Sequence, residues 1–239
     1  MTALTVLLRQ GGILVVHKPP GMLVVPGRNP AEGPTVPVVV ARELGIMPPR
    51  VCHRLDRDTS GALVLAETAD AHRELNAQFE RHLVRKSYLA LVAGCLETPR
   101  VVDAPLGDDV TAPRGARARQ APDPAGKPAR TLLVPVRTGA ERSLVAARPA
   151  TGRTHQVRAH LAHAGHPLEG DVLYGGPPGV RPLLHAAHVA FRLGGAELSA
   201  GAPAWEDLAG RMLALGWTAP SPAEVDATLT AAVRQLARG

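Results

Sequence analysis

One carboxylate in this chain stands among basic side chains at a turn. Asp56 is preceded by His53 and Arg54 and followed by Arg57, and an Asp-Thr-Ser-Gly run then leads into the apolar residues 62–66. A turn before a buried strand can hold side chains rigidly at the mouth of a cleft. The neighbouring positive charges favour the ionised carboxylate. Asp56 is therefore a candidate nucleophile or base, although the same charges could form an ion pair that only fixes a loop.

The segment 151–161 is a second candidate, which we expect to be a turn followed by a helix. The N-terminus of a helix attracts phosphate or carboxylate groups. Arg158 follows the inward-facing Val157, so its guanidinium borders the buried face and needs a carboxylate partner, since burying it alone is costly. Asp56 is the expected partner. The alternative, arginines and histidines that face solvent, fits this segment equally well when it is taken alone.

Histidines cluster in and after this segment, at His155, His160, His163 and His166. Their spacing does not match His-Glu-x-x-His, and the pair His160 and His163 lacks an obvious third ligand. We therefore expect no metal site, and we expect His155 to orient a neighbouring side chain through a hydrogen bond. A metal-dependent hydrolase built on these histidines is a rival interpretation, which the metal content of the purified protein would test.

Basic residues outnumber acidic ones by 27 to 21, and the net charge of +6 suits a polyanionic partner. The excess is concentrated around residues 107–129, a stretch rich in proline that we expect to be a loop excursion between strands. Between Thr111 and Arg130 the cations are Arg114, Arg117, Arg119, Lys127 and Arg130. Asp123 opposes them, and an ordinary solvated loop could have the same composition. Aromatic residues are 3% of the chain, so a sheet that stacks RNA bases on several aromatic rings is not expected.

Length and composition restrict the class of protein. The 239 residues suffice for one large domain or for a domain with an extension. No apolar run is long enough to span a bilayer, and the N-terminus does not resemble a secretory signal. Cys52 and Cys95 are the only cysteines, so neither a zinc ribbon nor a disulfide framework is expected. We therefore expect a cytoplasmic protein with reduced thiols.

The apolar pattern and the turn signals predict an α+β fold with a mixed, largely antiparallel sheet and flanking helices. Expected strands lie at 13–16, 22–25, 62–66, 88–92, 131–136, 143–147 and 183–193. Expected helices are capped by Thr35, Thr68, Thr154 and Ser221 and end near residues 44, 79, 164 and 236. We expect residues 1–193 to form a catalytic domain and residues 194–239 to form a C-terminal helical extension.

The order of motifs resembles that of the RluA family of pseudouridine synthases. The motifs are Lys18-Pro19-Pro20-Gly21, the run 53–61, Lys86-Ser87-Tyr88, the segment 151–158, the run 165–175 and Leu184-His185-Ala186. They cover the chain from near residue 10 to residue 193. For a lone Tyr88, a half-buried ring at a strand start is the simpler interpretation, but the resemblance implies an active-site ring.

The resemblance implies roles for these residues. Asp56 is then the catalytic carboxylate, Tyr88 stacks on the uracil, and Arg158 pairs with Asp56. Arg54 fills the space that a flipped base leaves. The other implied or expected RNA contacts are Arg57, Lys86, Arg114, Arg117, Arg119, Arg153 and His155. The implied reaction needs no cofactor and no metal, and whether Asp56 attacks C1′ or removes the C2′ proton stays open.

The expected function is isomerisation of particular uridines in structured rRNA or tRNA to pseudouridine. We expect a monomer without an obligate protein partner or a membrane. The alternative is a non-catalytic RNA-binding or ribosome-assembly factor on the same fold. The chain departs from the family at Gln10-Gly11-Gly12, where an acidic residue is usual, in the expected lack of an S4 domain, and from Gly194 onward, where no motif matches. These departures affect substrate choice rather than chemistry.

Overall fold

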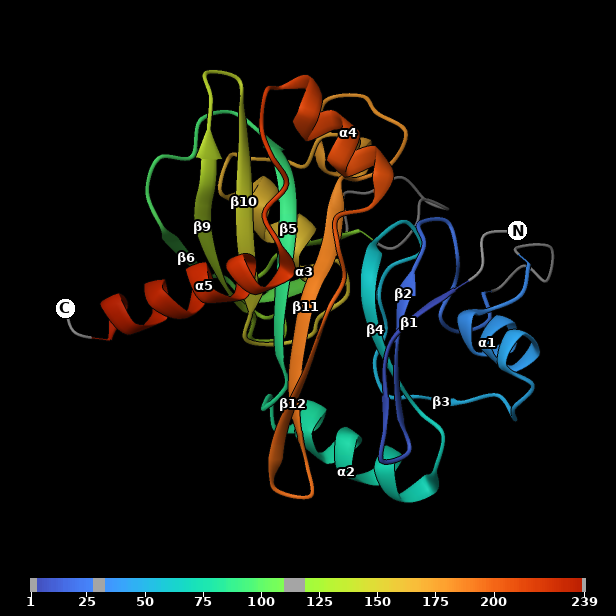
Figure 1. The fold of residues 1–239 in the computed structure, drawn as a ribbon. Helices are drawn as coiled ribbons and strands as arrows, with labels where there is room; N and C mark the ends of the chain where they lie inside the picture. Colours follow the sequence, from blue (N-terminus) through green and yellow to red (C-terminus); the bar gives the residue numbers. More distant parts are fainter. Residues whose placement is uncertain (1–3, 28–32, 110–118, 238–239) are drawn as a thin grey trace. The chain divides into compact units, whose positions relative to one another are not determined.

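The computed structural model describes residues 4–27, 33–109 and 119–237 (Figure 1). The chain forms two compact units, each built from segments that lie far apart in the sequence. Unit 1 contains Met1–Lys86, His185–Glu206 and Ser221–Ala223, and unit 2 contains Ser87–Leu184, Asp207–Pro220 and Glu224–Gly239. Among the described residues, no helix has both the length and the apolar character needed to cross a membrane.

The sheet of unit 1 has the strand order β1-β2-β4-β11, with β3 paired to β4 and β12 paired to β11. Its strands are β1 (Thr5–Gln10), β2 (Ile13–Lys18), β3 (Arg50–Val51), β4 (Ser60–Ala66), β11 (Leu184–Leu193) and β12 (Ala196–Gly201). β4 and β11 run parallel, with Gly61 opposite Ala186, and the other pairs are antiparallel. Gly61 permits this approach, because a Cβ there would lie 2.2 Å from the Ala186 carbonyl oxygen. The pairing fixes the start of β4, shortly after Asp56.

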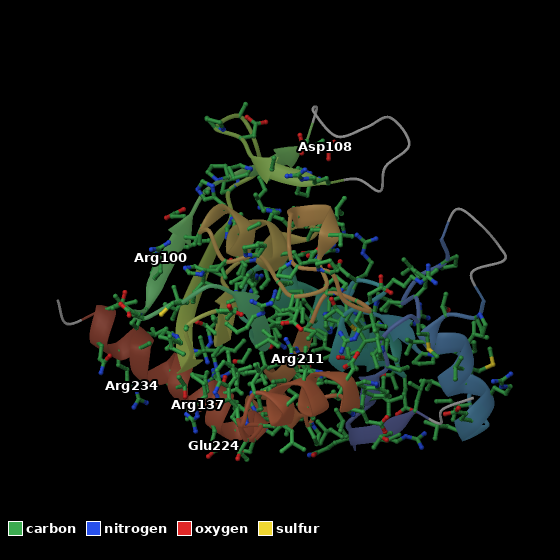
Figure 2. The ribbon with its side chains drawn as sticks, turned by 90° about the horizontal axis from the view of Figure 1, so that it is seen from above. Arg100, Asp108, Arg137, Arg211, Glu224 and Arg234 are labelled. Atoms are coloured by element: carbon green, nitrogen blue, oxygen red, sulfur yellow. The ribbon has the colours of Figure 1, made fainter. Side chains whose placement is uncertain are left out.

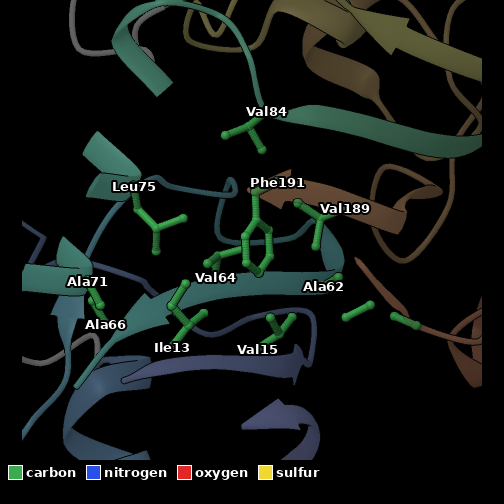
Figure 3. Packing of buried hydrophobic residues seen from close by; sticks show 12 residues of the cluster. Ile13, Val15, Ala62, Val64, Ala66, Ala71, Leu75, Val84, Val189 and Phe191 are labelled. Atoms are coloured by element: carbon green, nitrogen blue, oxygen red, sulfur yellow. The ribbon is translucent and has the colours of Figure 1, made fainter. Parts of the chain in front are cut away.

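Two helices and a buried apolar cluster complete unit 1. α1 (Val36–Leu44) ends at Gly45 in the left-handed conformation, as expected. α2 (Ala69–Glu80) begins at Thr68, whose hydroxyl accepts a hydrogen bond from the Ala71 amide. Apolar side chains from α2, β2, β4 and β11 gather in one cluster (Figure 3). They include Ile13, Val15, Val64, Leu75, Val189 and Phe191. Removal of this apolar surface from water stabilises unit 1, to which the Asp56 turn belongs.

The sheet of unit 2 has the strand order β5-β10-β9-β6 and is antiparallel throughout. Its strands are β5 (Arg85–Ala93, whose first two residues belong to unit 1), β6 (Arg100–Asp103), β9 (Arg130–Thr138) and β10 (Arg142–Pro149). Within the excursion between β6 and β9, β7 (Leu106–Asp108) and β8 (Gln120–Pro122) pair as a short hairpin. Residues 110–118, between these two strands, lie outside the described part of the chain.

The third expected helix is α3 (Gln156–His163), with Val157 and Leu161 buried as predicted. Its N-cap is His155 rather than Thr154, so that expectation is wrong by one residue. The His155 backbone is left-handed, with φ at 52°. The physical reason is a competing acceptor, because the Gln156 amide, which a Thr154 cap would take, donates to the Arg153 carbonyl oxygen at 3.2 Å.

The remaining helices of the described chain are the 3₁₀ helix η2 (Val172–Tyr174), α4 (Glu206–Ala214) and α5 (Pro222–Leu236). Val225 and Leu229 of α5 are buried as expected, but Val233 and Leu236 are exposed. The segment after residue 193 is not helical at its start, because β12 pairs with β11 there. The division at residue 193 into a catalytic domain and an extension stays a prediction.

The α+β class with a largely antiparallel sheet is confirmed. One expected strand, at residues 22–25, is absent, since these residues form turns and irregular backbone. The Leu23 carbonyl oxygen instead accepts a hydrogen bond of 2.8 Å from the Val36 amide at the start of α1. This apolar segment is therefore hydrogen-bonded to the start of a helix and not to a neighbouring strand.

Candidate functional site

The Asp56 turn of unit 1 is held by a buried lysine. Lys18 has no exposed surface, and its Nζ atom donates to the carbonyl oxygens of Pro19 and Arg57 at 2.7 and 2.8 Å. Arg57 in turn donates through Nε to the Gly21 carbonyl oxygen at 3.2 Å. The segment after β2 and the turn before β4 are therefore joined in both directions. Sequence reasoning did not assign Lys18 this role.

The side chains around Asp56 differ in exposure. Asp56 and Arg57 are half-buried, Leu55 is buried, and Arg54 is exposed. The Asp56 carbonyl oxygen accepts a hydrogen bond of 3.1 Å from the Thr59 amide, which closes the turn. The geometry leaves the Arg54 guanidinium on the surface, where an RNA could reach it.

His53 is not a source of positive charge, which corrects one expectation for this turn. Its Nε2 atom accepts a hydrogen bond of 3.0 Å from the Val64 amide, and its ring stacks on Phe79 with centroids 4.7 Å apart. Burial, and to a smaller extent the nearby charge of Lys86, lowers the pKa of His53 to about 3. His53 is therefore neutral at physiological pH, and it fixes the turn to β4 instead of polarising Asp56.

The start of β4 is fixed from the other side by His185 of β11, which is fully buried. His185 Nε2 lies 3.0 Å from the Ala202 carbonyl oxygen, so it donates there. Its Nδ1 atom lies 2.9 Å from the Ser60 hydroxyl. This buried histidine links both strands beside the close approach at Gly61.

Strand β5 carries two predicted site residues on one face, because Lys86 and Tyr88 are two positions apart. Tyr88 is buried, with 9% of its surface exposed, and lies opposite Ala147 in the β5–β10 ladder. Burial lowers the pKa of Lys86 to about 8. Lys86 therefore loses its charge at a lower pH than an ordinary surface lysine that binds phosphate.

Arg158 of α3 has a carboxylate partner within unit 2. Its Nε and Nη2 atoms donate to Oδ2 and Oδ1 of Asp171 at 2.7 and 2.8 Å. Both side chains are buried, with 8% of Arg158 and 1% of Asp171 exposed. A guanidinium has more donors than one carboxylate can accept, so the predicted pairing of Arg158 with Asp56 stays a prediction. Asp171 lies in the run 165–175, and no local pattern in the sequence marks it as the partner of Arg158.

Tyr174, at the end of η2, is buried beside Arg158 and contacts the excursion. Its hydroxyl accepts a hydrogen bond of 2.9 Å from the Gln120 amide and lies 3.2 Å from Nδ1 of His155. The Cζ atoms of Arg158 and Arg119 lie 5.1 and 5.6 Å from the ring centroid. The expectation that His155 orients a neighbour through a hydrogen bond is met at Tyr174.

Only some of the predicted phosphate-binding residues of unit 2 lie within the part of the chain that the structure describes. Arg119 Nε lies 3.2 Å from Oδ2 of Asp109, so a nearby acidic residue offsets its charge. Arg153 donates through Nε to the Pro128 carbonyl oxygen at 3.1 Å, which connects the helix start to the excursion. Arg114 and Arg117 lie outside the described residues.

The histidine cluster is used for packing and hydrogen bonding. His160 is buried, with Nδ1 2.8 Å from the Thr131 hydroxyl and Nε2 3.0 Å from the Ala104 carbonyl oxygen. His166 Nδ1 lies 3.1 Å from the Ala93 carbonyl oxygen. In the ranges that the structure describes, no three or more His, Cys, Asp or Glu side chains are grouped so that they could hold a metal ion.

Helix α4 is attached to unit 2 through a buried acid. Glu169 accepts hydrogen bonds from Arg142 at 2.8 Å and from Arg211 of α4 at 2.5 Å. Figure 2 labels Arg211. Burial raises the pKa of Glu169, but hydrogen bonds and charges of Arg211 and Arg142 outweigh it, and the pKa lies below its usual value. Arg181 adds a second link through both carboxylate oxygens of Asp207 at 2.6 Å.

The predicted site residues thus fall into two groups. Asp56, Arg54 and Arg57 belong to unit 1, and Tyr88 and Arg158 belong to unit 2. Hydrogen bonds of the buried Lys18 hold the turn of the first group, and the buried pair with Asp171 holds Arg158 in the second. The meeting of Asp56 with Tyr88 and Arg158 stays a prediction.

Comparison with known proteins identifies relatives across most of the chain. Residues 12–163 match the model of the RNA pseudouridylate synthase family. An uncharacterized RNA pseudouridine synthase of Chloroflexus aurantiacus is 42% identical over 182 residues, which are 72% of this chain and 56% of that protein. The ribosomal large subunit pseudouridine synthase D of Nitrosomonas europaea is 39% identical over 175 residues, 72% of this chain and 50% of that protein. The chain thus spans about half the length of these relatives.

Solved structures agree with this result. Human RNA pseudouridylate synthase domain containing 1 superposes with a TM-score of 0.74 at 26% identity, and the match covers 91% of this chain and 89% of that one. Human RNA pseudouridylate synthase domain containing 4 also has a TM-score of 0.74, at 21% identity, over 90% of this chain and 94% of that one. The second likeness concerns the fold.

Proposed function

The chain belongs to the RNA pseudouridylate synthase family, and from this premise we propose that it isomerises particular uridines of a structured RNA to pseudouridine. The observation that carries the proposal is the Asp56 turn, which lies within the matched residues 12–163 and is clamped by the buried Lys18. A rigidly held carboxylate is suited to chemistry at one atom of a bound ribose.

The reaction conserves all atoms of the nucleotide. The bond between C1′ and N1 of uracil breaks, the base turns, and C1′ bonds to C5, which loses its proton while N1 gains one. In this proposal Asp56 attacks C1′ or removes the C2′ proton to allow the first step. Tyr88 stacks on the detached uracil and assists removal of the C5 proton, and Arg158 pairs with Asp56 and keeps it ionised. This isomerisation has no step that calls for a cofactor or a metal.

The uridine must leave its stack to reach Asp56. We propose that the exposed Arg54 fills the space left behind. Phosphate contacts come from Arg57, Arg153 and the excursion cations Arg114, Arg117 and Arg119, and they release counterions from the RNA. His155 and Lys86 contribute near the site, and the pKa of about 8 makes the contribution of Lys86 dependent on pH.

The proposed substrate is rRNA, with tRNA as the second candidate. The names of relatives such as the Nitrosomonas europaea protein refer to the large ribosomal subunit, which favours rRNA. We further propose that the protein acts in the cytoplasm as a monomer without an obligate protein partner.

The test is to map pseudouridine by chemical sequencing of total RNA from cells with and without the gene. Recombinant protein is then added to RNA from the deletion strain. The expected result is loss of one or a few modified positions in the deletion strain and their return in vitro. If the two maps are identical and the added protein binds RNA without modifying it, the protein is a non-catalytic RNA-binding or assembly factor.

A further inference from the structure

Tyr174 connects two parts of unit 2 that the proposed mechanism uses separately. Its side chain is buried, with 6% of its surface exposed, and it packs with Leu106, Ala129 and Ala159. These neighbours belong to the excursion, to its end and to α3. A tyrosine there can use its hydroxyl and its ring for different contacts.

The hydroxyl of Tyr174 is bonded to the base of the excursion. It accepts the hydrogen bond of 2.9 Å from the amide of Gln120, the first residue of β8. Gln120 lies opposite Asp108 of β7, and its side chain donates to the Asp108 carboxylate at 2.7 Å (Figure 2 labels Asp108). The Asp109 amide donates to the Arg119 carbonyl oxygen at 2.8 Å and extends this pairing. The hydroxyl therefore holds both strands of the hairpin from which the basic excursion extends.

The ring of Tyr174 is placed against Arg158. The Arg158 Cζ atom lies 5.1 Å from the ring centroid, within the range of a cation–π contact. Asp171 accepts hydrogen bonds from two donors on one edge of the same guanidinium. A carboxylate at the edge and a ring beside it leave the guanidinium little freedom to tilt. The direction of its remaining donors is thereby fixed.

We propose that Tyr174 is a positioning residue with two separable functions: its hydroxyl sets the hairpin of β7 and β8 for RNA binding, and its ring sets Arg158 for the chemical step. The inference rests on the proposed function, in which the excursion grips phosphates and Arg158 supports Asp56. It assigns RNA affinity to the oxygen of Tyr174 and reaction rate to its ring. Gln120 acts with the hydroxyl side of this link, whereas the guanidinium of Arg119 lies over the ring, 5.6 Å from its centroid.

The test uses two substitutions at one position in the full chain. Tyr174→Phe removes the hydroxyl and keeps the ring, so RNA affinity should fall roughly fivefold, as for the removal of one hydrogen bond, while the saturated single-turnover rate stays within about twofold. Tyr174→Leu removes both, so the saturated rate should also fall by about tenfold or more. Leu173→Ala is the matched control, because Leu173 packs on the same cluster without a hydroxyl or a ring. It should lower the melting temperature, and it should not change the reaction rate and the RNA affinity by different factors.

A readout without RNA distinguishes this inference from the proposed function. In the free protein, amide hydrogen exchange at Gln120 should be faster in Tyr174→Phe than in wild type and unchanged in the melting-matched Leu173→Ala. Equal exchange in wild type and Tyr174→Phe overturns the hydroxyl function. A parallel fall of rate and affinity in both Tyr174 variants, as in a protein that is only less stable, overturns the separation. If wild-type protein makes no pseudouridine, the proposed function fails, and Gln120 exchange still decides whether the hydroxyl holds the excursion.

Discussion

The ammonium group of Lys18 donates a hydrogen bond of 2.8 Å to the carbonyl oxygen of Arg57, the residue directly after Asp56. Lys18 ends β2, and a second bond to the Pro19 carbonyl oxygen holds its side chain in place. The position of the carboxylate therefore depends on a lysine that lies 38 residues earlier and has no exposed surface. Backbone contacts of this kind place a side chain without occupying its reactive oxygens.

Lys18→Met should loosen the Asp56 turn, because two carbonyl oxygens lose a buried donor. We expect the free energy of unfolding to fall by about 1–3 kcal/mol and the reaction rate to fall more than RNA affinity. Chemical denaturation and single-turnover assays would measure both. Lys127→Met, at an exposed lysine, is the control for loss of one lysine charge and should leave stability unchanged. Wild-type stability in Lys18→Met would show that the clamp contributes nothing.

Asp56→Asn should abolish pseudouridine formation and preserve folding and RNA affinity. Asn has nearly the same shape but cannot act as a carboxylate nucleophile or base. The variant is incubated with total RNA from a deletion strain, and pseudouridine is mapped. Activity within about tenfold of wild type, a barrier change of only ~1.4 kcal/mol, would contradict the catalytic assignment.

Asp171→Asn should destabilise the protein strongly, because the buried guanidinium of Arg158 loses the carboxylate that accepts hydrogen bonds from its Nε and Nη2 atoms. Loss of one member of a buried pair typically costs about 3–5 kcal/mol. Asp70→Asn is the matched control, since Asp70 pairs with Arg73 on the surface, where their side chains are 88% and 77% exposed. Urea denaturation of both variants makes the comparison. A small effect at Asp171 would mean that water or another group compensates Arg158.

Glu169→Gln should lower stability near neutral pH and have little effect in acid. The pKa of Glu169 in the folded protein is depressed, so its carboxylate stabilises the fold above its ordinary pKa, and this stability is lost as pH falls through the lower, folded value. Melting temperatures of wild type and variant, measured from about pH 6 down to about pH 3, should therefore converge. A constant difference across this range would rule out titration of Glu169 as the cause.

The sequence predicts those parts of the fold whose signals lie within a few residues. Thr68 before α2 and Gly45 after α1 are such local signals, and both elements form where expected. Residues 22–25 have the apolar pattern of a strand, but their partner is the start of α1, which no local pattern specifies. The strand at Ala196–Gly201 is not predicted, because apolar and polar residues alternate only weakly in it. It forms through its hydrogen bonds to the neighbouring strand β11.

The candidate site shows the same division. Asp56 and Arg158 were found because their neighbours carry charge and turn signals. The contact of Lys18 with the turn, the pair of Arg158 with Asp171 and the two contacts of Tyr174 join residues that are 13 to 54 positions apart, and only packing brings them together. The neutral state of His53 likewise depends on its burial, to which the stacked ring of Phe79 belongs. The sequence does not show this burial, because the residues next to His53 are basic.

The last prediction separates RNA grip from base flipping. Changing Arg114, Arg117 and Arg119 together to Ala removes up to three phosphate contacts. The slope of log K against log[salt] should then flatten by up to roughly 0.7–0.9 for each phosphate that is no longer neutralised. At saturating RNA the single-turnover rate should change less than the affinity, because these residues bind ground and transition states about equally.

Arg54→Ala should behave in the opposite way. If the exposed Arg54 holds the flipped state open, its loss lowers the saturated rate more than the affinity, because duplex binding does not need it but access of the uridine to Asp56 does. Single-turnover titrations of both variants at several salt concentrations give rate, affinity and salt slope together. A wild-type slope in the triple variant would mean that the excursion is not an RNA clamp. A loss of affinity alone in Arg54→Ala would remove the base-flipping role, since a residue that only grips phosphate cannot alter the rate once RNA is saturating.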